Sequence, residues 1–276
     1  MSRIAARFAE LRKHGRAAFV PFITAGDPDA ETTLAILQKL PEAGADLIEL
    51  GIPFSDPMAD GPAVQGSSLR ALKAGMTLHK VLDLVRNFRK GDSATPLILM
   101  GYYNPIHAYG TARFVKDAAE VGVDGLITVD LPPEEDEVLR LPALVQGLDI
   151  VRLATPTTDD ERLRDVLNGA GGFLYYVSIT GTTGTKSFAE SDVRAAVARL
   201  KRASGLPVAV GFGIKTPEQA TQIARFADGA VVGSSIVDKI LEDVTAKSSR
   251  AKLVANVAEF CRVLADSVHA ARRETV

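Results

Sequence analysis

Two carboxyl side chains stand out because of their positions in the sequence. Glu49 interrupts the apolar run LIELG, and Asp60 follows eleven positions later in a segment that also contains Pro53 and Pro57. A glutamate flanked by leucine and isoleucine should be poorly solvated, which raises its pKa and allows it to donate and accept a proton. The prolines should stiffen the segment that carries Asp60. We therefore expect an acid–base pair; a buried ion pair for Glu49 and a turn role for Asp60 are the alternatives.

Two glycine-rich segments near the end of the chain predict a phosphate site. Each follows an apolar run, and together they supply Gly211, Gly213, Gly233, Ser234 and Ser235. Glycines let backbone N–H groups approach an anion closely, and a helix N-terminus adds favourable charge. The sequence has no GxxxxGK[ST] motif and no GxGxxG after the first apolar run, which favours a small phosphomonoester over a nucleotide. Plain turn glycines are the alternative.

A third candidate segment lies between these two groups. SITGTTGTKS (178–187) is rich in threonine and glycine, which suits a mobile lid over a substrate, although a surface loop is equally consistent. Tyr175 precedes it in the run FLYYVS and should point into the core of the fold if Tyr176 points outward. Tyr175 is thus either a site residue or a core residue.

Several kinds of chemistry have no matching motif. The four histidines are scattered without zinc-ligand spacing, and no GxSxG motif occurs. No lysine lies within any predicted strand, which argues against a Schiff-base aldolase. The remaining chemistry is acid–base catalysis by carboxylates on a phosphorylated small molecule, with no metal and no cofactor.

The elements that must position these residues alternate regularly along the chain. Short apolar runs that alternate with helical patterns predict strands of a parallel sheet covered on both faces. These runs are AAFVPFIT (17–24), DLIELG (46–51), PLILMG (96–101), GLITVD (125–130), DIVRLAT (149–155), FLYYVS (173–178), PVAVGFG (207–213) and GAVVGS (229–234). Eight such units favour an α/β fold, a (β/α)8 TIM barrel, over a doubly wound open sheet.

We expect this barrel to form a single domain over residues 1–276. An extra helix over 2–14 and a helical tail after Ser235 flank the repeated units. In such barrels catalytic groups lie at the carboxyl ends of strands, and phosphate commonly binds in the loops after strands 7 and 8. The expected positions of Glu49 and the glycine-rich segments agree with this rule.

Composition is typical of a globular enzyme. The 276 residues carry a formal net charge of −2, and 46% are hydrophobic, so no basic patch points to nucleic acid. The single cysteine, Cys261, excludes a disulfide framework and is consistent with a reducing cytosol. The N-terminus lacks a secretory h-region, and no apolar run reaches the ~18 residues of a membrane span. We therefore expect a cytoplasmic protein.

Several longer motifs occur together. They are PFITAGDP (21–28), LIELGIPFSDPMADGP (47–62), MGYYNP (100–105), SxxGxTG from Ser178 to Gly184, GFGI (211–214) and VVGSS (231–235). In order and spacing they resemble the tryptophan synthase alpha subunit over almost the whole chain. One departure is Thr182, where that family often has valine; we expect a small effect on the lid and none on the chemistry.

The resemblance implies cleavage of indole-3-glycerol phosphate to indole and glyceraldehyde 3-phosphate without a cofactor. It implies that Glu49 is the acid–base group at indole C3, and that Asp60 binds the indole N–H. Tyr175 and Thr183 match residues that hold Asp60 and the closed lid. It also implies a PLP-dependent beta subunit, in an alpha2-beta2 assembly, that consumes the indole.

Further positions are assigned by the same resemblance. The phosphate matches Gly184, Gly213, Ser234 and Ser235, with Gly211 and Gly233 giving room. Residues that line the indole pocket in the family correspond to Phe22, Met100, Ile127, Val129, Leu153 and Phe212, each of which could also be barrel core. The surface that meets the beta subunit corresponds to Pro53, Asp56, Pro57 and the segment 102–110, which includes Asn104 and Pro105.

Two other functions stay open from the sequence. One is another phosphate-binding barrel enzyme, such as an isomerase, an epimerase or indole-glycerol-phosphate synthase, although these need a metal, a strand lysine or a differently placed acid. The other is an alpha-like subunit without catalysis that activates a beta subunit. The presence of both Glu49 and Asp60 favours the lyase.

Overall fold

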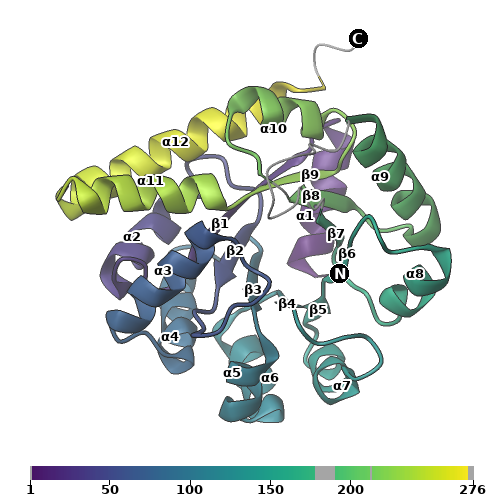
Figure 1. Ribbon diagram of the computed structural model, residues 1–276, viewed down its shortest axis with the longest axis horizontal. Coiled ribbons are helices and arrows are strands. Elements are labelled where there is room, and N and C mark those ends of the chain that lie inside the picture. Colours follow the sequence, from purple (N-terminus) through teal and green to yellow (C-terminus); the bar gives the residue numbers. More distant parts are fainter. Residues whose placement is uncertain (1, 178–189, 212, 273–276) are drawn as a thin grey trace.

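The computed structural model describes residues 2–177, 190–211 and 213–272. Within these ranges, nine strands form one sheet in which every pairing is parallel. The strands are β1 (Ala18–Thr24), β2 (Ile48–Gly51), β3 (Leu97–Gly101), β4 (Gly125–Thr128), β5 (Asp149–Ile150), β6 (Arg152–Ala154), β7 (Leu174–Val177), β8 (Val208–Gly211) and β9 (Gly229–Val232). Figure 1 shows the helices arranged around these strands.

The order of the strands closes the sheet into a barrel. β1 pairs with both β2 and β9, and the two ends of the order are β5 and β6, which are separated in the chain only by Val151. The expected strand 149–155 is therefore two short strands. They are separate because β5 pairs with β4 whereas β6 pairs with β7. Between them, the Val151 N–H still bonds Leu126 O at 3.0 Å. The predicted eight-unit barrel is confirmed with this one difference.

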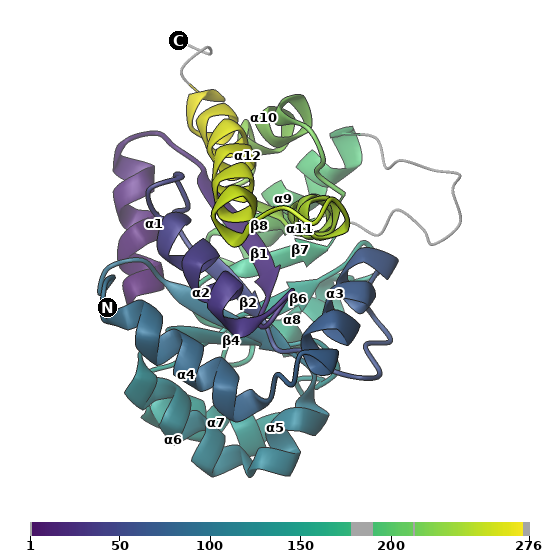
Figure 2. The same ribbon diagram turned by 90° about the vertical axis from the view of Figure 1, so that its left-hand side faces the viewer.

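Helices cover the outside of the barrel and its amino end (Figures 1 and 2). They are α1 (Arg3–Lys13), α2 (Ala30–Lys39), α3 (Pro62–Lys73), α4 (Leu78–Arg89), α5 (Tyr103–Tyr109), α6 (Thr111–Val121), α7 (Glu137–Val145), α8 (Asp160–Leu167), α9 (Glu190–Ser204), α10 (Pro217–Ala224), α11 (Ser234–Thr245) and α12 (Arg250–Ala270). α1 is the expected extra helix, and α12 is the expected tail, which packs against α2, α10 and α11.

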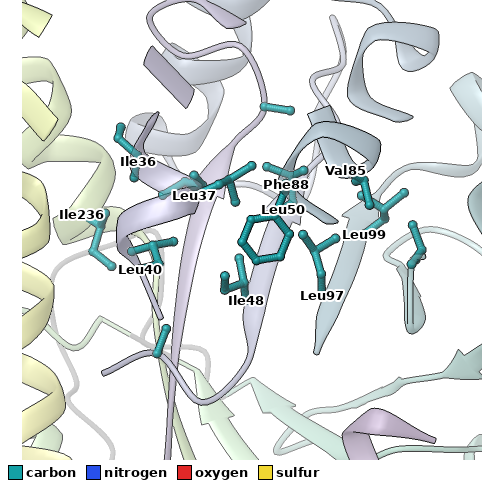
Figure 3. Close-up of a cluster of buried hydrophobic side chains, with 14 of the residues drawn as sticks. Ile36, Leu37, Leu40, Ile48, Leu50, Val85, Phe88, Leu97, Leu99 and Ile236 are labelled. Atoms are coloured by element: carbon teal, nitrogen blue, oxygen red, sulfur yellow. The ribbon is translucent and has the colours of Figure 1, made fainter. Parts of the chain in front are cut away.

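The main core lies between the sheet and the helices. Figure 3 shows Ile48 and Leu50 of β2 packed against Leu37 of α2 and Phe88 of α4. These side chains alternate along each strand with side chains that point into the barrel. The outer layer therefore fixes which residues of a strand face inward.

A second cluster fills the inside of the barrel. Leu47 lies in it together with Ile98 of β3 and Phe8 of α1, which seals the amino end. Glu49 comes two residues after Leu47 and pairs in register with Phe22 of β1 and Ile98. Strand periodicity therefore turns Glu49 inward, one layer closer to the carboxyl end of the barrel.

The amino end of the barrel also holds buried carboxylates, and these are fully paired. Asp124 accepts from Arg3 Nη1 and Arg89 Nη2, both at 2.7 Å, and from the Leu97 N–H at 2.8 Å. Asp46 accepts from the Phe19 N–H and contacts a ring nitrogen of His269 on α12. These contacts connect the strands to α1, α4 and the tail, and so stabilise the closed barrel.

Candidate active site

Glu49 is the most unusual carboxyl in the described part of the chain. Its side chain is completely buried, and neither carboxyl oxygen has a hydrogen-bond partner among the described residues. Burial without a compensating charge raises the pKa of Glu49 to about 8. Glu49 therefore carries a proton at neutral pH and can give it to a group that enters the barrel mouth. The expectation of a poorly solvated glutamate is confirmed.

Asp60 lies beside the same space in the loop between β2 and α3. Burial raises its pKa to about 6, while a hydrogen bond from Tyr102 opposes that rise. The Tyr102 hydroxyl also accepts the Ala59 N–H at 3.0 Å, so this tyrosine holds two consecutive residues of the loop. The pKa of Tyr102 is raised to about 12 by burial and by the nearby Asp60 charge, so it stays a hydrogen-bond donor. At pH 7 Asp60 is mainly ionised.

Tyr175 points into the barrel and Tyr176 points outward, as strand alternation predicts. Burial and the charges of Glu49 and Asp60 raise the pKa of Tyr175 well above its ordinary value, which places this phenol in the field of both carboxyls. A Cβ atom at Gly211 would lie 2.1 Å from the Tyr175 hydroxyl oxygen. Gly211 therefore makes room for Tyr175 in this structure.

Apolar side chains form the wall beside Asp60. Phe22, Met100 and Val129 line one pocket with it, and Thr24, Val64, Ser68 and Tyr102 complete that pocket. Phe22 reaches over Gly51, where a Cβ atom would lie 2.6 Å from the ring. The free volume between these side chains is about 10 Å³ in this structure.

Two other predicted pocket residues lie differently. Leu153 lines a neighbouring cavity of about 440 Å³ together with Val129, Leu139 of α7 and Val166 of α8. Ile127 is buried in the cluster inside the barrel and lines neither of these pockets. Ile127 pairs in register with Met100, which lines the pocket with Asp60.

Of the predicted phosphate residues, Gly233, Ser234 and Ser235 lie together at the start of α11. Gly233 is the N-cap and supplies no side-chain cap, and the first N–H groups of such a helix can bind an anion. Ser235 donates its hydroxyl to Ile214 O at 3.0 Å, and that contact ties the two glycine-rich segments together. Gly213 has φ +57°, a left-handed conformation that favours glycine, and a Cβ atom there would meet nothing within 4 Å.

The remaining predicted residues are distributed as follows. Thr183, Gly184 and Phe212, with Thr182, lie outside the described residues. Of the expected partner surface, Asp56 and Asn104 are exposed and Pro105 is half-buried, whereas Pro53 and Pro57 are buried. The two prolines are therefore packed inside this chain, where they hold the loop in place from its buried side.

Thr24 was not predicted, and Tyr102, which the segment 102–110 placed on the partner surface, is instead buried and bonds Asp60. Tyr102 lies within the motif MGYYNP, directly after β3. The position of catalytic groups at the carboxyl ends of barrel strands could have identified it. Thr24 ends β1 and lines the same pocket as Asp60. Among the described residues, no group of three or more His, Cys, Asp or Glu side chains could hold a metal ion.

Known proteins are similar to this chain in both fold and sequence. Residues 8–269 match the family model described as tryptophan synthase alpha chain. A tryptophan synthase subunit alpha from Legionella pneumophila is 41% identical, with 97% of this chain and 98% of that chain covered and a TM-score of 0.90. A tryptophan synthase structure from Mycobacterium tuberculosis gives 33% identity, coverage of 97% and 98%, and a TM-score of 0.87. The chain therefore belongs to the tryptophan synthase alpha chain family, whose reaction is cleavage of indole-3-glycerol phosphate.

Proposed function

We propose that Glu49 and Asp60 carry the alpha reaction of this chain, in opposite protonation states. The observation that supports this assignment is the buried carboxyl of Glu49, which has a pKa of about 8 and no hydrogen-bond partner among the described residues, together with Asp60, which has a pKa of about 6. Between these values Glu49 is an acid and Asp60 is an anion. Two carboxyls whose environments separate their pKa values in this way can divide acid and electrostatic roles.

The reaction needs both roles at one ring. Glu49 protonates indole C3, and the ring becomes a cation whose charge is shared with the indole nitrogen. Asp60 accepts the N–H hydrogen bond and stabilises that charge. The Glu49 carboxylate then removes the proton of the hydroxyl next to the bond that breaks. As this C–O bond becomes a carbonyl, the C–C bond breaks, its electrons return to the ring, and indole and glyceraldehyde 3-phosphate result.

The rest of the site orients the substrate. Phe22, Met100 and Val129 would hold the indole ring with its N–H toward Asp60. The start of α11, with Ser234, Ser235 and Gly213, would hold the phosphate through N–H groups. Tyr175 would help to exclude water from Glu49 and Asp60, because it is buried in the inner cluster and lies in the field of both carboxyls.

Family membership implies a beta subunit partner. An alpha2-beta2 assembly with a PLP-dependent beta subunit, and a cytoplasmic location, belong to the proposal. Asp56 and Asn104 are the exposed residues that we assign to the contact, with Pro105 beside them. Every helix within the described ranges is too short or too polar to span a bilayer.

Replacement of Glu49 by glutamine tests the assignment. The amide keeps the size of the side chain but cannot cycle a proton, so we expect kcat for indole release to fall about 10²–10⁴-fold with little change in KM. The exposed Glu42→Gln, earlier in the same unit, is the control and should leave kcat unchanged. Turnover of Glu49→Gln within about tenfold of the parent would contradict the role of Glu49.

A further inference from the structure

Helix α3, which follows the Asp60 loop, has an unusual buried face. Its buried residues are Ser67, Ser68 and Ala71, whereas its large apolar residue Leu69 is 59% exposed. The neighbouring α4 buries large side chains, which are Val81, Leu82, Leu84, Val85 and Phe88. Small side chains contribute little burial energy. The orientation of α3 therefore depends on directional contacts.

Two such contacts join α3 to the carboxyl end of β1. The hydroxyl oxygens of Thr24 and Ser67 lie 2.6 Å apart, and both side chains are buried. One helical turn later, Arg70 donates through Nε and Nη2 to the two carboxylate oxygens of Asp27, each at 2.8 Å. A bidentate pair of this kind fixes direction as well as distance.

The same helix carries the wall of the indole pocket. Val64 and Ser68 of its first two turns line the pocket that Asp60 also lines. Asp60 lies two residues before the first residue of α3, and Gln65 Nε2 donates back to the Asp60 carbonyl oxygen at 2.8 Å. A shift of α3 along β1 would therefore move Asp60 and the pocket wall together.

We propose that Thr24 and the Asp27–Arg70 pair are positioning residues that set the place of Asp60 through helix α3. The inference rests on the proposed role of Asp60. A displaced Asp60 carboxylate changes the contact with the ring more directly than the phosphate contacts at α11, so loss of the Thr24–Ser67 or Asp27–Arg70 contact should lower kcat more than it changes KM. Small displacements of a charged catalytic group cost up to about 10²-fold in rate.

The first test separates the effect of the Thr24 hydroxyl from the effect of the side chain's shape. Thr24→Val keeps the volume but removes the contact with Ser67, and we expect kcat to fall about tenfold with KM within about threefold. Thr24→Ser loses only the methyl group and should retain kcat within about twofold. In an Asp60→Asn background, Thr24→Val should cause no further loss, because it acts through Asp60.

The second test uses a matched pair of ion-pair variants. Arg70→Lys removes the bidentate geometry at the carboxyl end, and Arg89→Lys removes the guanidinium that reaches the buried Asp124 through Nη2 at the amino end. Both should lower the urea midpoint, but only Arg70→Lys should lower kcat. Measuring both separates positioning from general destabilisation.

The outcomes distinguish failure of the positioning role from failure of the proposed function. If Thr24→Val and Arg70→Lys retain kcat within twofold while Asp60→Asn loses activity, the positioning role is wrong and the proposed function stands. A kcat loss from Thr24→Val that persists in the Asp60→Asn background, or an equal loss in Arg89→Lys, also overturns the positioning role. An active Asp60→Asn variant overturns the proposed function instead.

Discussion

The buried carboxylates at the amino end of this barrel and the two candidate catalytic carboxyls at its carboxyl end, Glu49 and Asp60, are used in opposite ways. At the amino end, Asp124 has two arginines and a backbone N–H, and Asp46 has a backbone N–H and His269. At the carboxyl end, Glu49 has no hydrogen-bond partner within the described part of the chain, and Asp60 has the Tyr102 hydroxyl. The same chemical group stabilises the fold where it is paired and becomes reactive where it is not.

The largest expected effect is at the carboxyl end. Asp60→Asn removes the anion that faces the ring cation, so kcat should fall about 10²–10³-fold. Stability should be retained at pH 7, because burial already disfavours the Asp60 charge. Steady-state turnover and urea unfolding of the same preparation check both statements. A variant that loses stability but retains kcat would reverse the comparison.

The amino end should respond in the opposite way. Asp124→Asn leaves Arg3 and Arg89 without their shared carboxylate, and loss of one partner of a buried pair costs about 3 kcal/mol or more of unfolding free energy. Its kcat should stay within about twofold of the parent, because Asp124 lies at the closed end. Equilibrium urea unfolding measures the loss, and a kcat loss comparable to that of Asp60→Asn would contradict the separation of roles.

A smaller effect is expected at Tyr102. Its hydrogen bond lowers the pKa of Asp60, so Tyr102→Phe should move the acid limb of the kcat/KM profile above pH 6. We expect a shift of about one pH unit and a loss of about twofold in kcat/KM at pH 7, since a hydrogen bond to a charged group is worth about 1.5 kcal/mol or more. Tyr109→Phe, which removes a tyrosine–aspartate bond to Asp117 on the outer surface, is the control and should change neither value. An unmoved acid limb would exclude Tyr102 as the group that tunes Asp60.

Much of this arrangement could be predicted from the sequence, because it depends on local patterns of apolar residues. Strand periodicity and apolar runs depend on neighbouring residues, so they predicted the barrel, the extra helix, the inward turn of Tyr175 and the burial of Glu49. A charged residue within such a run is informative because its burial needs a chemical reason.

Other features depend on contacts between distant segments. The bond between Tyr102 and Asp60 requires the path of the loop after β2, and the Thr24–Ser67 contact requires the rotation of α3. The burial of Pro53 and Pro57 follows from the same loop path. The division of the fifth strand into β5 and β6 arises from their different neighbours, which no local pattern reports.

The two limbs of the pH profile connect these residues to activity. Asp60 must be ionised, so kcat/KM should rise as the pH passes about 6, and Glu49 must be protonated, so kcat/KM should fall as the pH passes about 8. The profile should therefore be bell-shaped. Asp60→Asn should lose the acid limb in its residual activity and keep the basic one.

The central claim is that Glu49 carries a proton at neutral pH because it is buried and no described residue pairs with it. Infrared difference spectra between the parent and Glu49→Gln, with carboxyl groups labelled by ¹³C, report this proton directly. We predict a protonated carboxyl band at pH 7 that is absent from Glu49→Gln and disappears as the pH passes about 8. If the difference spectrum instead shows an ionised Glu49 throughout pH 6–7, the account is wrong.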